Sequence, residues 1–152
     1  MAEEILVASH AAREALKQVR VALVEVETED EEGNPLDHNA GFRRAYSRRF
    51  KRSQSAFDDA RKCSLLAEIH FGEAAAAHVR EISVVANEVW VAAEMLYWQD
   101  SSGYDREFRQ ELRRTLSAMP SQKYPDKIAS RVEAAIQGLT NDLKPYLQLT
   151  RK

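Results

Sequence analysis

Residues that build turns, disulfides and cofactor loops are scarce in this chain of 152 residues, which has one cysteine, five glycines and four prolines. The single cysteine, Cys63, excludes an intramolecular disulfide, and no group of Cys and His residues has the spacing of a zinc site. The glycines form neither a phosphate-binding loop nor a dinucleotide fingerprint, and there is no Gly-x-Ser-x-Gly motif. We therefore expect no cofactor and no catalytic residue, and we predict a protein that is not an enzyme.

Long hydrophobic runs are also missing. The most apolar stretch, residues 82–98, contains Asn87, Glu88 and Glu94, and it falls short of the ~18 uncharged apolar residues that a membrane span needs. Residues 1–4 begin acidic and lack the basic start and apolar run of an export signal. The net charge of −2, with 30% charged residues, argues against general affinity for nucleic acid and against disorder. We expect a soluble cytoplasmic protein without a membrane span.

Apolar residues at helical spacing are what the sequence has instead. Near the N-terminus they alternate in steps of four and three, which predicts a helix over residues 3–28. This seam is Ile5, Ser9, Ala12, Leu16, Val19, Leu23 and Val26. The β-branched run at 19–26 alone would suit a strand, but the helical spacing continues through it. Residues 29–41 collect acids, two glycines and a proline, and are predicted to form a long acidic loop.

Four further helices are predicted, over residues 42–70, 73–98, 105–119 and 125–144. Gly72 separates the first two, Asp105 can cap the third, and Pro120 ends it. Pro125 suits the first turn of the last helix, which is expected to stop near Pro145 because proline cannot continue the hydrogen-bond ladder. The whole chain, 1–152, is predicted to be one all-α domain: an antiparallel bundle of four to five helices with a long amphipathic N-terminal helix.

Six basic residues and no acidic residue lie within 43–52, with Tyr46 and Phe50 between them. At ~100° per residue these aromatics share a face with Phe42 and Phe57, so all four are expected in the core. The opposite face carries a basic stripe of Arg44, Arg48, Lys51 and Arg52. Three interpretations of this stripe stay open: compensation by the acidic run 25–32 within one chain or between two copies, recognition of a protein partner, or binding of nucleic acid or acidic lipid.

Other reactive side chains give weaker signals. No histidine has a glutamate three residues before it, as a di-iron bundle would require, and the reversed pair His78/Glu81 is expected to be an ordinary surface pair. No metal site is therefore predicted. Cys63 has basic neighbours in sequence, but neighbours on a helix point in different directions, so a half-buried, inert thiol is predicted.

An aromatic cluster closes the predicted central helix. Trp90 and Tyr97 are seven residues apart on the inward face and are assigned to the core. Trp98 points elsewhere, beside Gln99 and Asp100, and is the candidate for a contact surface, since tryptophan is enriched at interfaces.

Three short motifs carry a resemblance: Phe-Asp-Asp-Ala-Arg-Lys at 57–62, Ile-His-Phe-Gly-Glu at 69–73 and Leu-Lys-Pro-Tyr-Leu at 143–147. Over about residues 42–149 the chain resembles uncharacterised bacterial proteins in which this pattern forms a small helical domain, often behind an N-terminal membrane helix. The resemblance implies a helical fold and a bacterial source, and it assigns no catalytic residue. Here an amphipathic segment replaces that membrane helix, so membrane anchoring is not implied.

These observations favour a non-enzymatic helical interaction module, as a subunit or adaptor of a bacterial assembly or as a homo-oligomer. The expected partner is a protein or a second copy, because the seam of residues 3–28 can pack in its own bundle or against another chain as a coiled coil. The alternative is a nucleic-acid-binding accessory protein that uses the basic stripe.

Overall fold

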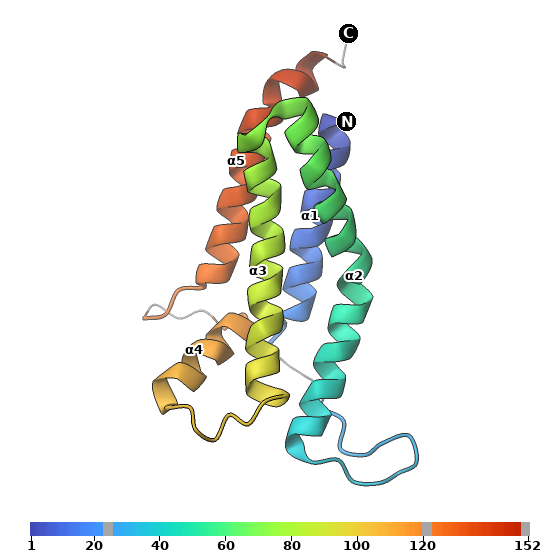
Figure 1. The fold of residues 1–152 in the computed structure, drawn as a ribbon, viewed down its shortest axis with the longest axis vertical. Coiled ribbons are helices and arrows are strands. Elements are labelled where there is room, and N and C mark those ends of the chain that lie inside the picture. The colour runs from blue at the N-terminus through green and yellow to red at the C-terminus, as the bar shows by residue number, and fades with distance from the viewer. Residues whose placement is uncertain (23–25, 120–122, 150–152) are drawn as a thin grey trace.

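The computed structural model is an antiparallel bundle of α-helices, as the sequence predicts (Figure 1). It describes residues 1–22, 26–119 and 123–149. The helices are α1 (Ala2–Val19), α2 (His38–Phe71), α3 (Glu73–Tyr97), α4 (Arg106–Leu116) and α5 (Lys127–Leu149). Within these described residues no β-strand occurs, and no helix is long and apolar enough to cross a membrane.

The central element of the bundle is α3, which packs against every other helix and most extensively against α2. In Figure 1 the long helices alternate in direction, and the short α4 lies across the lower end of α3. Small residues allow close packing at the upper end, where Ala67, Ala75 and Ala76 are almost fully buried. Larger side chains from all five helices fill the rest of the core.

The first helix is shorter than predicted. Its seam is buried from Ile5 to Val19 as expected, but the helix ends at Val19 rather than near residue 28. Of the two remaining seam positions, Val26 is only partly buried and outside any helix, and Leu23 lies outside the described residues. The β-branched run that follows has low helix propensity. In addition, Arg49 of α2 donates hydrogen bonds of 2.9 Å to the carbonyl groups of Val19 and Val21, which satisfies acceptors that the end of a helix leaves open.

A buried arginine explains where the chain goes after α1. Arg20 is 3% exposed, and its guanidinium donates to both carboxylate oxygens of Asp126, at 2.9 and 3.0 Å. It also donates to the carbonyl oxygens of Thr115 at 2.8 Å and Arg114 at 3.1 Å, while its own carbonyl accepts from the N–H of Ala118. The residue therefore joins the end of α1 to the end of α4 and the start of α5.

The second helix begins earlier than predicted, at His38 instead of residue 42, because Asp37 caps it by accepting a hydrogen bond from the N–H of Ala40. Gly41 is buried in the first turn, where an added Cβ would lie 2.4 Å from the Glu27 carbonyl oxygen. Only glycine lets the incoming chain pass this close. At the other end Gly72 has φ of +89°, so α2 stops there and α3 starts at the next residue, as predicted.

The last two helices differ from the prediction in opposite directions. α4 ends at Leu116, so Met119 lies outside it and is 73% exposed; Pro120 is outside the described residues. α5 starts at Lys127 and continues through Pro145 to Leu149. Proline removes only one hydrogen bond of the ladder, to the carbonyl group of the exposed Asn141. Packing of Tyr146 on Phe71, with ring centroids 4.7 Å apart, holds the final turn.

Replacing Arg20 by methionine tests whether this arginine organises the lower end of the bundle. The change leaves the half-buried Asp126 carboxylate and the α4 carbonyl groups without their donor, so we expect the free energy of unfolding to fall by about 3 kcal/mol. Urea denaturation followed by circular dichroism measures it. Arg52→Met, at an exposed position, is the control and should change stability by less than about 0.5 kcal/mol. A loss below about 1 kcal/mol for Arg20→Met would contradict this account.

Candidate functional site: a charged cleft and a basic helix face

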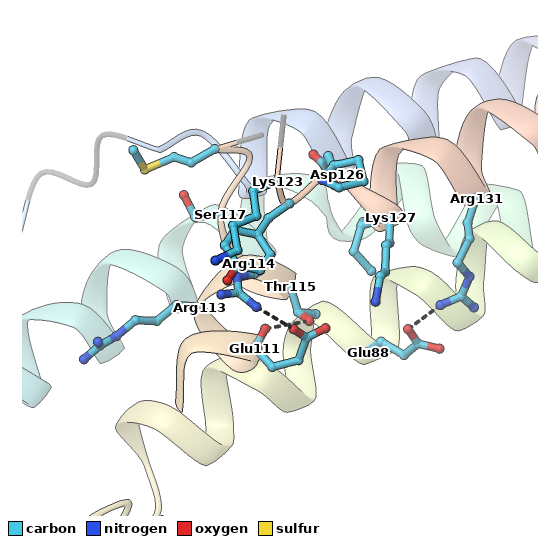
Figure 2. Close-up of a pocket in the computed structure, with 14 residues that line it drawn as sticks. Glu88, Glu111, Arg113, Arg114, Thr115, Ser117, Lys123, Asp126, Lys127 and Arg131 are labelled. Carbon is cyan, nitrogen blue, oxygen red and sulfur yellow. Dashed lines mark hydrogen bonds and ion pairs between the residues drawn. The ribbon is translucent and has the colours of Figure 1, made fainter. Parts of the chain in front are cut away.

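A cleft of about 540 Å³ lies where α3, α4 and the start of α5 meet (Figure 2). Its charged lining consists of Glu88, Glu111, Arg113, Arg114, Lys123, Asp126, Lys127 and Arg131. Arg114 and Asp126 are also acceptors of the Arg20 guanidinium, through a carbonyl and a carboxylate respectively. The buried arginine therefore holds two walls of the cleft in place.

The acids of the cleft are each bound to an arginine. Arg131 donates to Glu88 at 2.6 Å and to Glu81 at 2.7 Å, and these hydrogen bonds raise the pKa of the Arg131 guanidinium. Arg114 donates to Glu111 at 3.2 Å, and its guanidinium carbon lies 3.6 Å from the centroid of the Tyr124 ring. With Asp126 held by Arg20, none of the three carboxylates is placed as an open general base.

Cations outnumber acids in this cleft. Figure 2 shows Lys127 extending into the space between Glu111 and Glu88, whereas Arg113 points away from the other labelled side chains. Lys127 is exposed and has no ion pair within the part of the chain that the structure describes. The arrangement can attract an anion but is poorly suited to proton transfer.

The predicted basic stripe is compensated in part by the chain itself. Arg44 and Arg48 both pair with Glu27, the former at 3.5 Å, so the acidic segment faces the stripe within one chain. The neighbouring Arg43 donates to the Tyr97 carbonyl oxygen at 2.9 Å. The two remaining members of the stripe, Lys51 and Arg52, are exposed, and neither has an ion pair among the described residues.

The aromatic residues of α2 lie on the inward side, as predicted, but not equally deep. Tyr46 and Phe57 are buried, whereas Phe42 and Phe50 are only partly buried. Tyr46 lies in a stack with Phe42 and Tyr97, and burial raises the pKa of its hydroxyl to about 12, with a smaller contribution from Tyr97. This stack closes the lower end of the α2–α3 contact.

Trp98 directly follows α3 and is 39% exposed, with its ring centroid 5.4 Å from that of Trp90. The prediction that Trp90 and Tyr97 belong to the core is only partly right, because both are half-buried. Sequence reasoning missed two apolar residues in line with Trp98, Val84 and Val91, which are also exposed. Their spacing of seven residues was visible in the sequence.

The residues of the charged cleft have no regular spacing in the sequence, because they come from three separate segments. Sequence reasoning therefore missed the cleft.

The histidines lie apart from one another and from clusters of acidic side chains in the part of the chain that the structure describes. Among residues 1–22, 26–119 and 123–149, no three His, Cys, Asp or Glu side chains come together in a way that could hold a metal ion. The pairing expected for His78 with Glu81 is wrong: the His78 ring packs over Gly138 of α5 and lies 3.5 Å from Asp142, while Glu81 binds Arg131.

No protein-family model, curated protein or solved structure matches the chain. Its function therefore has to be inferred from its own residues.

The lone thiol is more deeply placed than the half-buried position predicted for it. Cys63 is 6% exposed within the upper part of the core. Burial, with smaller contributions from Glu4 and Asp59, raises its pKa, so the neutral thiol predominates in the folded protein. Since the thiolate is the reactive form, Cys63 is not set up as a nucleophile.

Thiol titration with a disulfide reagent tests this placement. At about pH 8 we expect the folded protein to react at least tenfold more slowly than the same protein in urea, because folding both covers the sulfur and disfavours its thiolate. The raised pKa also means that stability falls as the pH rises through the ordinary thiol pKa, since the unfolded thiol ionises first. Equal rates in the folded and unfolded protein would contradict the buried position.

Proposed function

We propose that the protein is a non-enzymatic helical interaction module that pairs with a second copy of itself through the outer face of α3. The observation that carries the proposal is a line of exposed small or apolar residues along this helix. Ala77, Val84, Val91 and Trp98 follow one another at intervals of seven, and the three larger ones are 47%, 38% and 39% exposed. We call this line the α3 ridge.

A seven-residue repeat is the spacing that keeps one helix face against another along a shared seam. If two copies cross in antiparallel fashion, Val84 of each copy meets Val91 of the other. The same register places Ala77 opposite Trp98 at both ends, so the largest side chain of the ridge packs against the smallest. A two-fold axis makes these contacts self-complementary, as a symmetric dimer requires.

Charges beside the ridge fit the same register. Arg80 lies one turn from Ala77, and Glu94 lies one turn from Trp98. In the antiparallel pair each Arg80 approaches Glu94 of the second copy. Arg80 already contacts Glu68 and Glu73 on its own surface, so the added pair would extend an existing exposed network. The polar residues between the apolar ones suit a reversible contact rather than an obligate one.

The seam of α1 is not free for this role. Its apolar positions are covered by α2, α3 and α5 of the same chain. The predicted interaction surface is therefore reassigned from the N-terminal helix to α3, and Trp98 becomes one end of it.

Light scattering after size-exclusion chromatography over a concentration series tests the dimer. We expect a monomer–dimer equilibrium that Val91→Glu shifts to monomer, because the substitution places charges near the two-fold axis. Val7→Glu is the matched control: Val7 is 62% exposed on α1, away from the ridge, and its replacement should leave the equilibrium unchanged. A wild-type protein that remains monomeric up to about 1 mM would refute self-association.

Nucleic-acid binding is the less supported alternative, since Glu27 pairs with two of the four residues of the basic stripe. If it were the function, Glu27→Gln should strengthen binding of a single-stranded oligonucleotide, and the affinity should fall steeply with salt. Fluorescence anisotropy with wild type, Glu27→Gln and Lys51→Glu/Arg52→Glu measures this. We expect no measurable binding by any of the three proteins at about 150 mM salt. Salt-dependent binding that Glu27→Gln strengthens and the double variant loses would favour the alternative.

A further inference from the structure

A second hollow, of about 440 Å³, lies between the middle parts of α2 and α3. Figure 1 shows α2 curving away from α3 over this stretch, above the point where the Phe42–Tyr97 stack brings the two helices together. We call this hollow the α2–α3 groove. It lies on the side of α3 that faces α2, and it is formed by one chain.

The floor of the groove is aromatic. Phe50, Phe57 and Trp90 line it, with the Phe50 and Trp90 rings edge-to-face at 4.9 Å and the Phe50 and Phe57 centroids 6.5 Å apart. Phe50 and Trp90 are only partly buried, so part of each ring remains uncovered. Ring faces that are held by their neighbours and still accessible can stack against a flat apolar ligand.

The rim of the groove is cationic and polar. Lys51 and Arg61 line it together with the amide side chains of Gln54 and Asn87, and no acidic side chain of the described residues does so. Arg61 forms an ion pair with Asp58 at 3.2 Å, whereas Lys51 has no ion pair within the described ranges. An uncompensated ammonium group therefore stands beside an aromatic floor.

We propose that the α2–α3 groove binds a small aromatic carboxylate, with its ring against Phe50 and Trp90 and its carboxylate beside Lys51. The volume lies within the range of small-molecule sites, and an apolar floor with a few polar groups at the edge is their usual composition. The absence of acids from the described lining gives the site its preference for an anion over a neutral or cationic ligand. The groove adjoins the α3 ridge, because the ring centroids of Trp90 and Trp98 are 5.4 Å apart, but one chain forms it alone and no second copy is needed.

Titration of the full chain with 1-naphthoate, followed by two-dimensional proton–nitrogen NMR, tests the site. Trp98→Phe leaves Trp90 as the single indole and identifies its ring N–H signal. We expect this signal and the backbone amides of 47–61 and 83–90 to shift in a saturable manner. The neutral analogue 1-naphthylmethanol should bind about fivefold more weakly, as expected for one partly exposed charge pair. No saturable shift, or shifts centred outside these two segments, would overturn the proposal.

Two adjacent cations provide the matched variants. Lys51→Gln should weaken naphthoate binding about fivefold and leave naphthylmethanol binding unchanged, whereas Arg52→Gln removes the same charge from a position outside the groove lining and should change neither. Equal effects of the two substitutions would show that general charge attracts the probe, and would overturn the site. Ser83→Phe, which fills the groove from α3, should abolish binding with circular dichroism unchanged; if it perturbs the fold, the Lys51 and Arg52 comparison decides. Val91→Glu should bind as wild type does, which separates this test from that of the dimer.

Discussion

The lower end of the bundle depends on one buried guanidinium. Arg20 satisfies the carbonyl groups that end α4 and the carboxylate that precedes α5, and in return those groups compensate a charge that would otherwise be costly to bury. Because Asp126 also caps α5 by accepting from the N–H of Ala129, the same ion pair fixes the starting direction of that helix. The charged cleft between α4 and α5 exists in its present shape because this contact sets its walls.

Arginines close three helix ends in this structure. The C-terminal carbonyl groups receive arginine side chains from distant segments: Arg49 at Val19 of α1, Arg43 at Tyr97 of α3, and Arg20 at Arg114 and Thr115 of α4. A positive charge at a helix C-terminus is also favourable for the helix dipole. Glycine usually provides such endings, and it does so here only for α2, at Gly72. Two members of the basic run, Arg43 and Arg49, are used in this way, so the run as a whole does not form an open basic surface.

Local patterns predicted the parts of the fold that local forces decide. The helical seam from Ile5 to Val19, the Asp105 cap and the break at Gly72 could all be read from neighbouring residues, and the structure confirms them. The end of α1 could not, because the groups that bind Arg20 lie 94 to 106 positions away. Likewise, the spacing of Arg44 and Arg48 showed their common face, and compensation by the acidic run 25–32 was one open interpretation, but the sequence could not single out Glu27 as the partner. The groove was missed because the inward face of α2 was treated as uniformly buried, whereas its curvature leaves Phe50 and Trp90 partly open.

The separation between Arg20 and its acceptors also imposes an order on synthesis by the ribosome. Arg49 reaches the end of α1 across only 28 to 30 residues, so the hairpin of α1 and α2 can close while the rest of the chain is still being made. The guanidinium of Arg20 remains hydrated until Asp126, which binds it in the folded protein, has been synthesised. Closing the lower end of the bundle therefore needs nearly the whole chain, whereas closing the α1–α2 hairpin does not.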